Sequence, residues 1–134
     1  MNTLLITPND FSPKVILDPM NNIFEISGKS IIENTNKFYN PILQWLEEYK
    51  NILYLGKDKL DKAAFCVFRF NLDYINSTSV KAIKDVLIQL DKIAQDGNKI
   101  LAKWYYDKYD EDMKELGKTF STLMKKLQFE FSEN

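Results

Sequence analysis

A long strand-like run at the centre of this chain restricts its fold more than any other feature. The run AFCVFRFNLDYI, residues 64–75, alternates along its length and is apolar on both sides at its start, which is typical of a central strand covered on both faces. An amphipathic helix pattern follows over residues 80–94 and ends near Gly97, a typical left-handed C-cap residue, before a second strand-like run at residues 100–106. Together these segments predict a parallel, right-handed strand–helix–strand unit.

The alternation of the central run places five residues on one face: Cys66, Phe68, Phe70, Leu72 and Tyr74. Of these, Cys66, Phe68 and Phe70 are expected to be buried. Cys66 is the only cysteine of the chain, so an internal disulfide is excluded. We interpret it as a small buried hydrophobic residue rather than a reactive thiol.

The segments before the central run predict a hairpin and a helix. Residues 14–18 and 22–28 read as two short strands separated by turn residues, which predicts an antiparallel hairpin. Apolar residues at helical spacing then predict a helix over residues 38–53, with Pro41 in its first turn or kinking a longer helix. The polar and charged residues 54–62 read as an exposed connection.

The C-terminal segments predict one further helix and complete a small domain. The acidic run DKYDED, residues 107–112, suits a helix start, and an apolar stripe follows from Met113 to Leu127. The tail, residues 128–134, adds a short strand or frays. We therefore predict one α/β domain over residues 1–134, with a small mixed four-stranded sheet and flanking helices.

The composition argues against several classes of function. The chain has 18 basic and 19 acidic residues and a net charge of -1, so we expect no nucleic-acid partner. It contains no histidine, which removes the usual general base and the commonest metal ligand. Its four glycines form no phosphate-binding loop. We therefore expect no enzyme activity, no metal and no cofactor.

The N-terminal segment predicts the location of the protein. MNTLLITPND has no basic region followed by a long apolar core, so it does not read as a signal peptide. No apolar run approaches the roughly 18 residues that a membrane span requires. We expect a cytoplasmic protein that makes no membrane contact.

Four small polar residues, NSTS at positions 76–79, lie where the central strand meets the next helix. The helix needs one N-cap there, which Asn76 or Ser77 would supply. Open α/β sheets place their sites at such a carboxyl end, and a phosphoryl group would meet free N–H groups and the positive end of the helix dipole. The residues leave both interpretations open: a helix cap alone, or a phosphorylated switch.

The predicted topology also gives this corner its neighbours. In a parallel unit the carboxyl ends of both strands lie at one edge of the sheet. Tyr105, Tyr106 and Asp107 end the second strand, so we expect them to lie near Ser77 and Ser79.

In order and spacing, several parts of the sequence resemble the SiaC family of bacterial regulatory phosphoproteins. These parts are Ser30 with Glu33 and Asn34, the helix with aromatic residues and Trp45, Asn76 with Ser77, and Trp104-Tyr105-Tyr106 followed by Asp112, Glu115, Gly117 and Phe120. The resemblance covers nearly the whole chain after about Ser12 and implies a fold like that of anti-sigma-factor antagonists (STAS-like). Two positions depart from the family pattern: Ile32 replaces a proline, and Ser77 replaces a threonine.

The resemblance implies a phosphorylation switch at this corner. The acceptor would be the hydroxyl directly after the asparagine, Ser77, with Thr78 as the alternative because related proteins carry the acceptor one place later. A dedicated kinase would add the phosphate and a PP2C-like phosphatase would remove it. The unmodified form would bind and activate a diguanylate cyclase, an enzyme of cyclic-di-GMP signalling.

The partner-binding residues that we predict come from several segments: Ser30, Glu33, Asn34, Asn76, Ser79, Tyr105 and Tyr106. We expect phosphate on Ser77 to block partner binding, because a buried interface would have to desolvate its charge. The alternative function is an anti-sigma-factor-antagonist type of partner switching, with a sigma-factor regulator as the partner.

Overall fold

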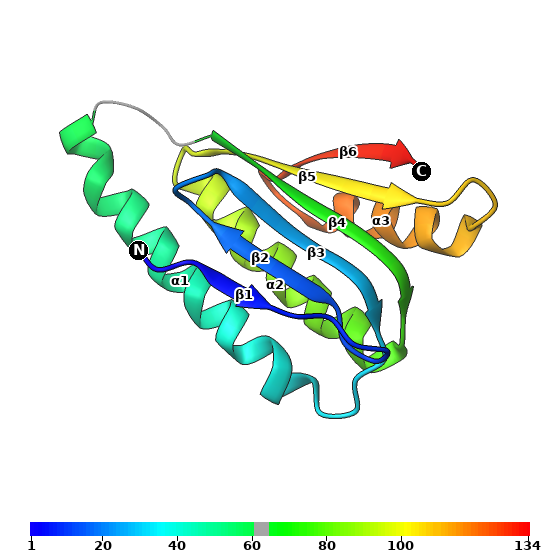
Figure 1. The fold of residues 1–134 in the computed structure, drawn as a ribbon. Coiled ribbons are helices and arrows are strands. Elements are labelled where there is room, and N and C mark those ends of the chain that lie inside the picture. Colours follow the sequence, from blue (N-terminus) through cyan, green and yellow to red (C-terminus); the bar gives the residue numbers. More distant parts are fainter. Residues whose placement is uncertain (61–64) are drawn as a thin grey trace.

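The computed structural model describes residues 1–60 and 65–134 and forms one six-stranded sheet with three helices (Figure 1). The elements in chain order are β1 (Leu4–Ile6), β2 (Lys14–Asp18), β3 (Ile23–Ser30), α1 (Thr35–Leu60), β4 (Phe65–Ile75), α2 (Ser77–Gln95), β5 (Lys99–Tyr106), α3 (Glu111–Leu123) and β6 (Gln128–Glu133). The strands lie in the sheet in the same order as in the sequence.

The sheet is antiparallel at its start and parallel afterwards. β1, β2 and β3 pair antiparallel, and β3 to β6 pair parallel, with one helix in each parallel connection. All three helices cover the same face of the sheet, and α1 and α2 begin at the edge where β3 and β4 end (Figure 1). The predicted hairpin and the predicted parallel strand–helix–strand unit are confirmed.

The prediction of four strands is wrong, because the sequence patterns did not identify either of the two outer strands, β1 and β6. β1 has three residues, too few to show an alternation, and it is defined by its pairing with β2, for example Leu4 with Leu17. β6 is the tail that the sequence left undecided between strand and fraying, and it pairs with β5, for example Phe131 with Trp104. The likeness to anti-sigma-factor antagonists stays a prediction.

Three local predictions also differ from the structure. Residues 54–60 continue α1 instead of forming a connection, and the predictions for residues 61, 62 and 64 lie outside the described residues. Pro41 lies inside α1, so the longer of the two predicted helices is the correct one. No helix among the described residues is long and apolar enough to cross a membrane.

β4 is central in the sheet, but helices cover only one of its faces. Phe68 and Phe70 are fully buried beneath the helices, and their rings stack at a centroid distance of 4.7 Å. Phe65, on the opposite face, is 60% exposed, so the prediction of a strand covered on both faces is wrong. Cys66 is buried as predicted, and burial raises the pKa of its thiol to about 12.

The Asp91 carboxylate of α2 holds the connection between α3 and β6. It accepts hydrogen bonds from the backbone N–H groups of Lys126 and Leu127, both at 2.8 Å, and of Lys125 at 3.1 Å, and from the Gln95 side chain. These bonds turn the chain away from the helix, so α3 ends at Leu123 and the predicted stripe does not reach Leu127 as helix.

The Asp91 carboxylate should stabilise the fold when it is ionised. Burial raises the pKa of Asp91, but the hydrogen bonds from Lys126, Leu127, Lys125 and Gln95 outweigh it and hold the pKa below its ordinary value. We expect Asp91→Asn to lower the free energy of unfolding by about 1–3 kcal/mol at pH 7. The stabilisation is present above the unfolded-state pKa of about 3.9 and is lost as the pH falls through the folded-state pKa.

Urea unfolding followed by circular dichroism at neutral and acid pH measures this effect. The difference in the free energy of unfolding between wild type and Asp91→Asn should become smaller below about pH 4. Asp85→Asn is the matched control, because Asp85 lies on the same helix without a hydrogen bond or ion pair among the described residues. The same difference in the free energy of unfolding at every pH would contradict a stabilising role of the ionised Asp91 carboxylate.

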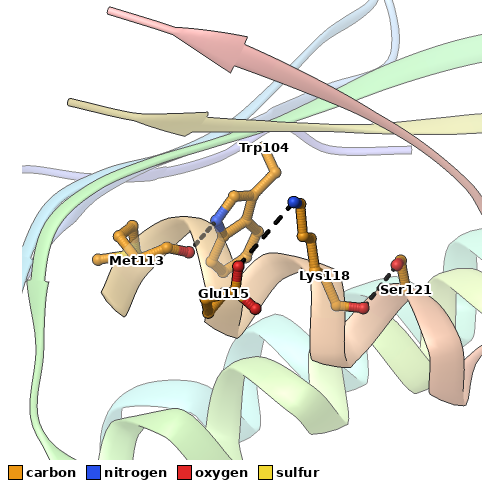
Figure 2. A network of polar contacts seen from close by, with 5 residues as sticks. All are labelled: Trp104, Met113, Glu115, Lys118 and Ser121. Carbon is orange, nitrogen blue, oxygen red and sulfur yellow. Dashed lines mark hydrogen bonds and ion pairs between the residues drawn. The ribbon is translucent and has the colours of Figure 1, made fainter. Parts of the chain in front are cut away.

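At Gly117, the backbone of α3 packs directly against the Trp104 ring. Trp104 is fully buried and its Nε1 donates a hydrogen bond to the Met113 carbonyl at 2.9 Å (Figure 2). A Cβ atom at position 117 would lie 2.4 Å from Trp104 Cδ1. We expect Gly117→Ala to destabilise the protein by about 1–3 kcal/mol through overpacking, although alanine is the better helix former.

Gly56 of α1 is the control for this substitution. Apart from the adjoining residues and the nearby backbone of α1 itself, no described atom lies within 4 Å of a Cβ built at Gly56, so Gly56→Ala should stabilise the protein by up to about 1 kcal/mol. Thermal unfolding should therefore shift in opposite directions for the same chemical change. A neutral or stabilising Gly117→Ala would show that Trp104 has room to move.

Candidate functional site

The polar corner between β4 and α2 is built on Asn76. Asn76 is the N-cap of α2, with an extended backbone (φ -77°, ψ 168°), and its Oδ1 accepts a hydrogen bond from the Ser79 N–H at 3.0 Å. Its own N–H donates to the Ser30 carbonyl at 2.9 Å, and its Nδ2 donates to the Ile32 carbonyl at 3.1 Å. One side chain therefore caps α2 and ties it to the end of β3, which decides between the two caps that the sequence allowed.

Two of the corner's hydroxyls are buried and belong to the interior. Ser30 and Ser79 are fully buried, and the Ser30 hydroxyl donates to Ser79 Oγ at 2.8 Å. The Tyr39 hydroxyl of α1 lies 2.7 Å from Ser30 Oγ and, because Ser30 already donates to Ser79, it is the donor in this bond. Burial raises the pKa of Tyr39 to about 12, so the phenol keeps its proton at neutral pH. This chain of hydroxyls joins α1, β3 and α2.

The two exposed hydroxyls of the corner differ in their bonding. The Thr78 hydroxyl donates to the Ile32 carbonyl at 2.9 Å and lies 3.2 Å from Asn76 Oδ1. The Ser77 side chain is also exposed, but its hydroxyl has no hydrogen-bond partner among the described residues. Ser77 therefore presents the free hydroxyl of the corner.

A surface hollow of about 440 Å³ lies beside this hydroxyl, between the first turns of α1 and α2. Its lining residues are Thr35, Asn36, Ser77, Thr78, Lys81, Ala82 and Asp85. The backbone N–H groups in the first turn of a helix have no partner within the helix, so this end of α2 favours an anion. Within the described residues no group of three or more Cys, Asp or Glu could hold a metal ion. The arrangement suits a phosphoryl group on Ser77.

The remaining predicted partner-binding residues are distributed around the edge of the sheet. Glu33 and Asn34 are exposed between β3 and α1, and Asn34 Oδ1 accepts from the Lys37 N–H at 3.3 Å. Tyr105 and Tyr106 are half-buried at the end of β5, which ends at the same edge as β4, as the predicted topology requires.

Tyr105 and Tyr106 stay predicted partner-binding residues, whereas the buried side chains of Ser30 and Ser79 are not accessible to a partner. The ammonium of Lys114, from α3, lies 5.4 Å from the centre of the Tyr106 ring, and no described interaction links either tyrosine to the corner. Ser30 and Ser79 support the corner from beneath and do not reach the surface. Of the predicted set, Glu33, Asn34 and Asn76 lie on or beside the accessible part of the corner.

Three exposed apolar side chains near the corner were missed by the sequence patterns. Phe11 is 64% exposed, Ile31 37% and Tyr74 55%. The Ile31 N–H donates to the Phe11 carbonyl at 2.8 Å, which brings the loop between β1 and β2 to the end of β3. The sequence could have indicated an exposed Phe11, because it is the only aromatic residue in the otherwise polar segment TPNDFSP.

The prediction that Tyr74 shares the buried face of β4 is wrong. Leu72 pairs with Gly28 and Tyr74 with Lys29, so the register between β3 and β4 shifts by one residue at this point. Beyond the shift the alternation no longer follows the buried face, and Tyr74 turns toward solvent.

A stability comparison tests the division of the hydroxyls. We expect Ser79→Ala to lower the free energy of unfolding by about 1–3 kcal/mol, because the buried Ser30 hydroxyl loses its acceptor. Ser77→Ala should stay within about 0.5 kcal/mol of wild type, because the exposed Ser77 hydroxyl has no hydrogen-bond partner within residues 1–60 and 65–134. Urea unfolding of the two variants measures both effects, and equal losses would contradict the division.

Comparison with known proteins identifies the family of this chain. Residues 6–134 match the family model described as SiaC family regulatory phosphoprotein. An uncharacterized protein of Pseudomonas aeruginosa strain UCBPP-PA14 is 27% identical over 120 residues, which are 90% of this chain and 88% of that protein.

The fold is similar to solved structures of SiaC from Pseudomonas aeruginosa. The apo form gives a TM-score of 0.81 at 23% identity over 98% of this chain and 99% of that chain. A second SiaC structure gives 0.82 at 22% identity over 100% of both chains. A third structure, the diguanylate cyclase SiaD in complex with its activator SiaC, gives a TM-score of 0.81 at 23% identity over 98% of this chain and 99% of that chain. The structures show a shared fold, and the match of residues 6–134 shows the family: this chain belongs to the SiaC family of regulatory phosphoproteins.

Proposed function

We propose that this chain is a phosphorylation-switched adaptor whose unphosphorylated form binds and activates a diguanylate cyclase. Two findings support the proposal: membership of a family of regulatory phosphoproteins, and a shared fold with a protein that is the activator of such a cyclase. Residues 1–134 act as one regulatory domain in the cytoplasm and catalyse no reaction of their own.

The free hydroxyl of Ser77 is the observation that carries this proposal. A cognate kinase transfers the γ-phosphoryl group of ATP to Ser77 Oγ as the hydroxyl loses its proton, and a PP2C-like phosphatase hydrolyses the ester back to serine and inorganic phosphate. Modification of Thr78 would first break its hydrogen bond to the Ile32 carbonyl, whereas the Ser77 hydroxyl has no hydrogen bond to any residue that the structure describes. The geometry therefore favours Ser77 over Thr78 as the acceptor.

Phosphate at this position changes the surface more than the fold. It adds about -1.5 to -2 charges at pH 7, which the first turn of α2 tolerates. The exposed side chains of Phe11, Ile31 and Tyr74 provide apolar contact area for a partner near the corner. An interface built on them would have to desolvate the phosphate, so phosphorylation releases the cyclase.

Binding and activity measurements with the diguanylate cyclases of the source genome test this function. We expect wild type and Ser77→Ala to bind one of them and raise its production of cyclic-di-GMP. Ser77→Asp should bind at least about tenfold more weakly, because its carboxylate places charge in the interface. Thr78→Val is the matched control and should keep the response to phosphorylation.

Mass spectrometry of the protein from its own cells locates the phosphate, which we expect on Ser77. Phosphate on Thr78 with Ser77 unmodified would contradict the assignment of the acceptor. Tighter binding of the phosphorylated form would contradict the direction of the switch. Recovery of a sigma-factor regulator in place of any cyclase would contradict the proposed partner.

A further inference from the structure

Lys81 lies beside the proposed phosphorylation site and has no ion-pair partner in the part of the chain that the structure describes. It lies one helical turn after Ser77, its side chain is exposed, and it lines the same hollow as Ser77 and Thr78. No ion pair of Lys81 exists among the described residues, although Asp85 lies one further turn along α2. Residues four apart on a helix have their Cβ atoms about 5–6 Å from each other, so Lys81 and a group on Ser77 reach one another directly.

The hollow is complementary to a single anionic group near Ser77. The free N–H groups of the first turn of α2 and the Lys81 ammonium both favour negative charge there. Asp85 disfavours it at the other end of the hollow, which confines the anion to the Ser77 side. Glu33 and Lys37, the charged residues that flank the start of α1, are not among the lining residues and have opposite signs.

We propose, on the basis of the proposed function, that Lys81 is shared between two anions. In the unphosphorylated protein it binds a carboxylate of an acidic side chain on the cyclase. In the phosphorylated protein it binds the phosphate on Ser77. The phosphate then acts as an intramolecular competitor, because it occupies the cation that the partner needs and repels the partner's carboxylate.

The competition explains the direction of the switch without a change of fold. A phosphate tethered one turn from Lys81 has a high effective concentration, so it displaces a carboxylate supplied by a second molecule. The hydroxyl chain of Ser30, Tyr39 and Ser79 does not need to move for this exchange, because all three residues are buried and none of them lines the hollow.

The phosphate arm of the experiment needs no partner. Full-length protein carrying phosphoserine at position 77 is titrated by phosphorus-31 NMR, in which the second pKa of a phosphoserine is ordinarily about 6. We expect Lys81→Ala to raise that pKa by about 0.2–0.7 unit, as the loss of an exposed charge pair would. Lys81→Arg should keep the wild-type value, and so should Lys92→Ala, which removes an exposed lysine at the far end of α2. An unchanged pKa in Lys81→Ala would overturn the proposal.

The partner arm uses the cyclase that binds the wild-type protein. Lys81→Ala should weaken binding of the unphosphorylated protein about tenfold and reduce its salt dependence, Lys81→Arg should restore both, and Lys92→Ala should change neither. Wild-type affinity in Lys81→Ala would overturn this inference and leave the proposed function intact. Failure of the wild-type protein to bind any diguanylate cyclase would overturn both, and the wild-type control separates the two outcomes.

Discussion

The side chain and backbone of Asn76 hold together the part of the molecule on which the proposed function depends. Three of its hydrogen bonds cap α2 at Ser79 and fasten it to the carbonyl groups of Ser30 and Ile32 at the end of β3. Without these hydrogen bonds, polar groups in the loop after β3 and in the first turn of α2 would lose their partners, and the two segments would no longer be held in a fixed relative position. The separate environments of the neighbouring hydroxyls follow from this one residue.

A second constraint is the one-sided packing of the sheet. Because β3, β4, β5 and β6 are parallel and joined in order, the three helices lie on one face (Figure 1). The rings of Phe24, Phe68, Phe70 and Trp104 then form one aromatic layer beneath them. The same topology brings the starts of α1 and α2 to one edge, so two helix N-termini flank the hollow beside Ser77.

The consequence is a site that combines a rigid base with a free surface group. Ser30, Tyr39 and Ser79 are buried and bonded to one another, and Thr78 is bonded to the loop after β3. Ser77 alone of the corner hydroxyls has no such bond among the described residues. A modification there changes charge and leaves the packing in place, which is the property that a reversible switch requires.

The hairpin, the central strand, the three helices, the parallel unit and the position of the polar corner could all be predicted from the sequence. Each of these depends on neighbours two to four residues apart, or on the order of segments, and both can be read along a chain. Three features became known only from the three-dimensional structure: β1 and β6 join the sheet, Tyr74 faces solvent, and Ser77 rather than Thr78 has a hydroxyl without a partner among the described residues. These outcomes depend on contacts between distant segments: Thr78 is bonded to a carbonyl 46 residues earlier, and no local pattern contains that distance.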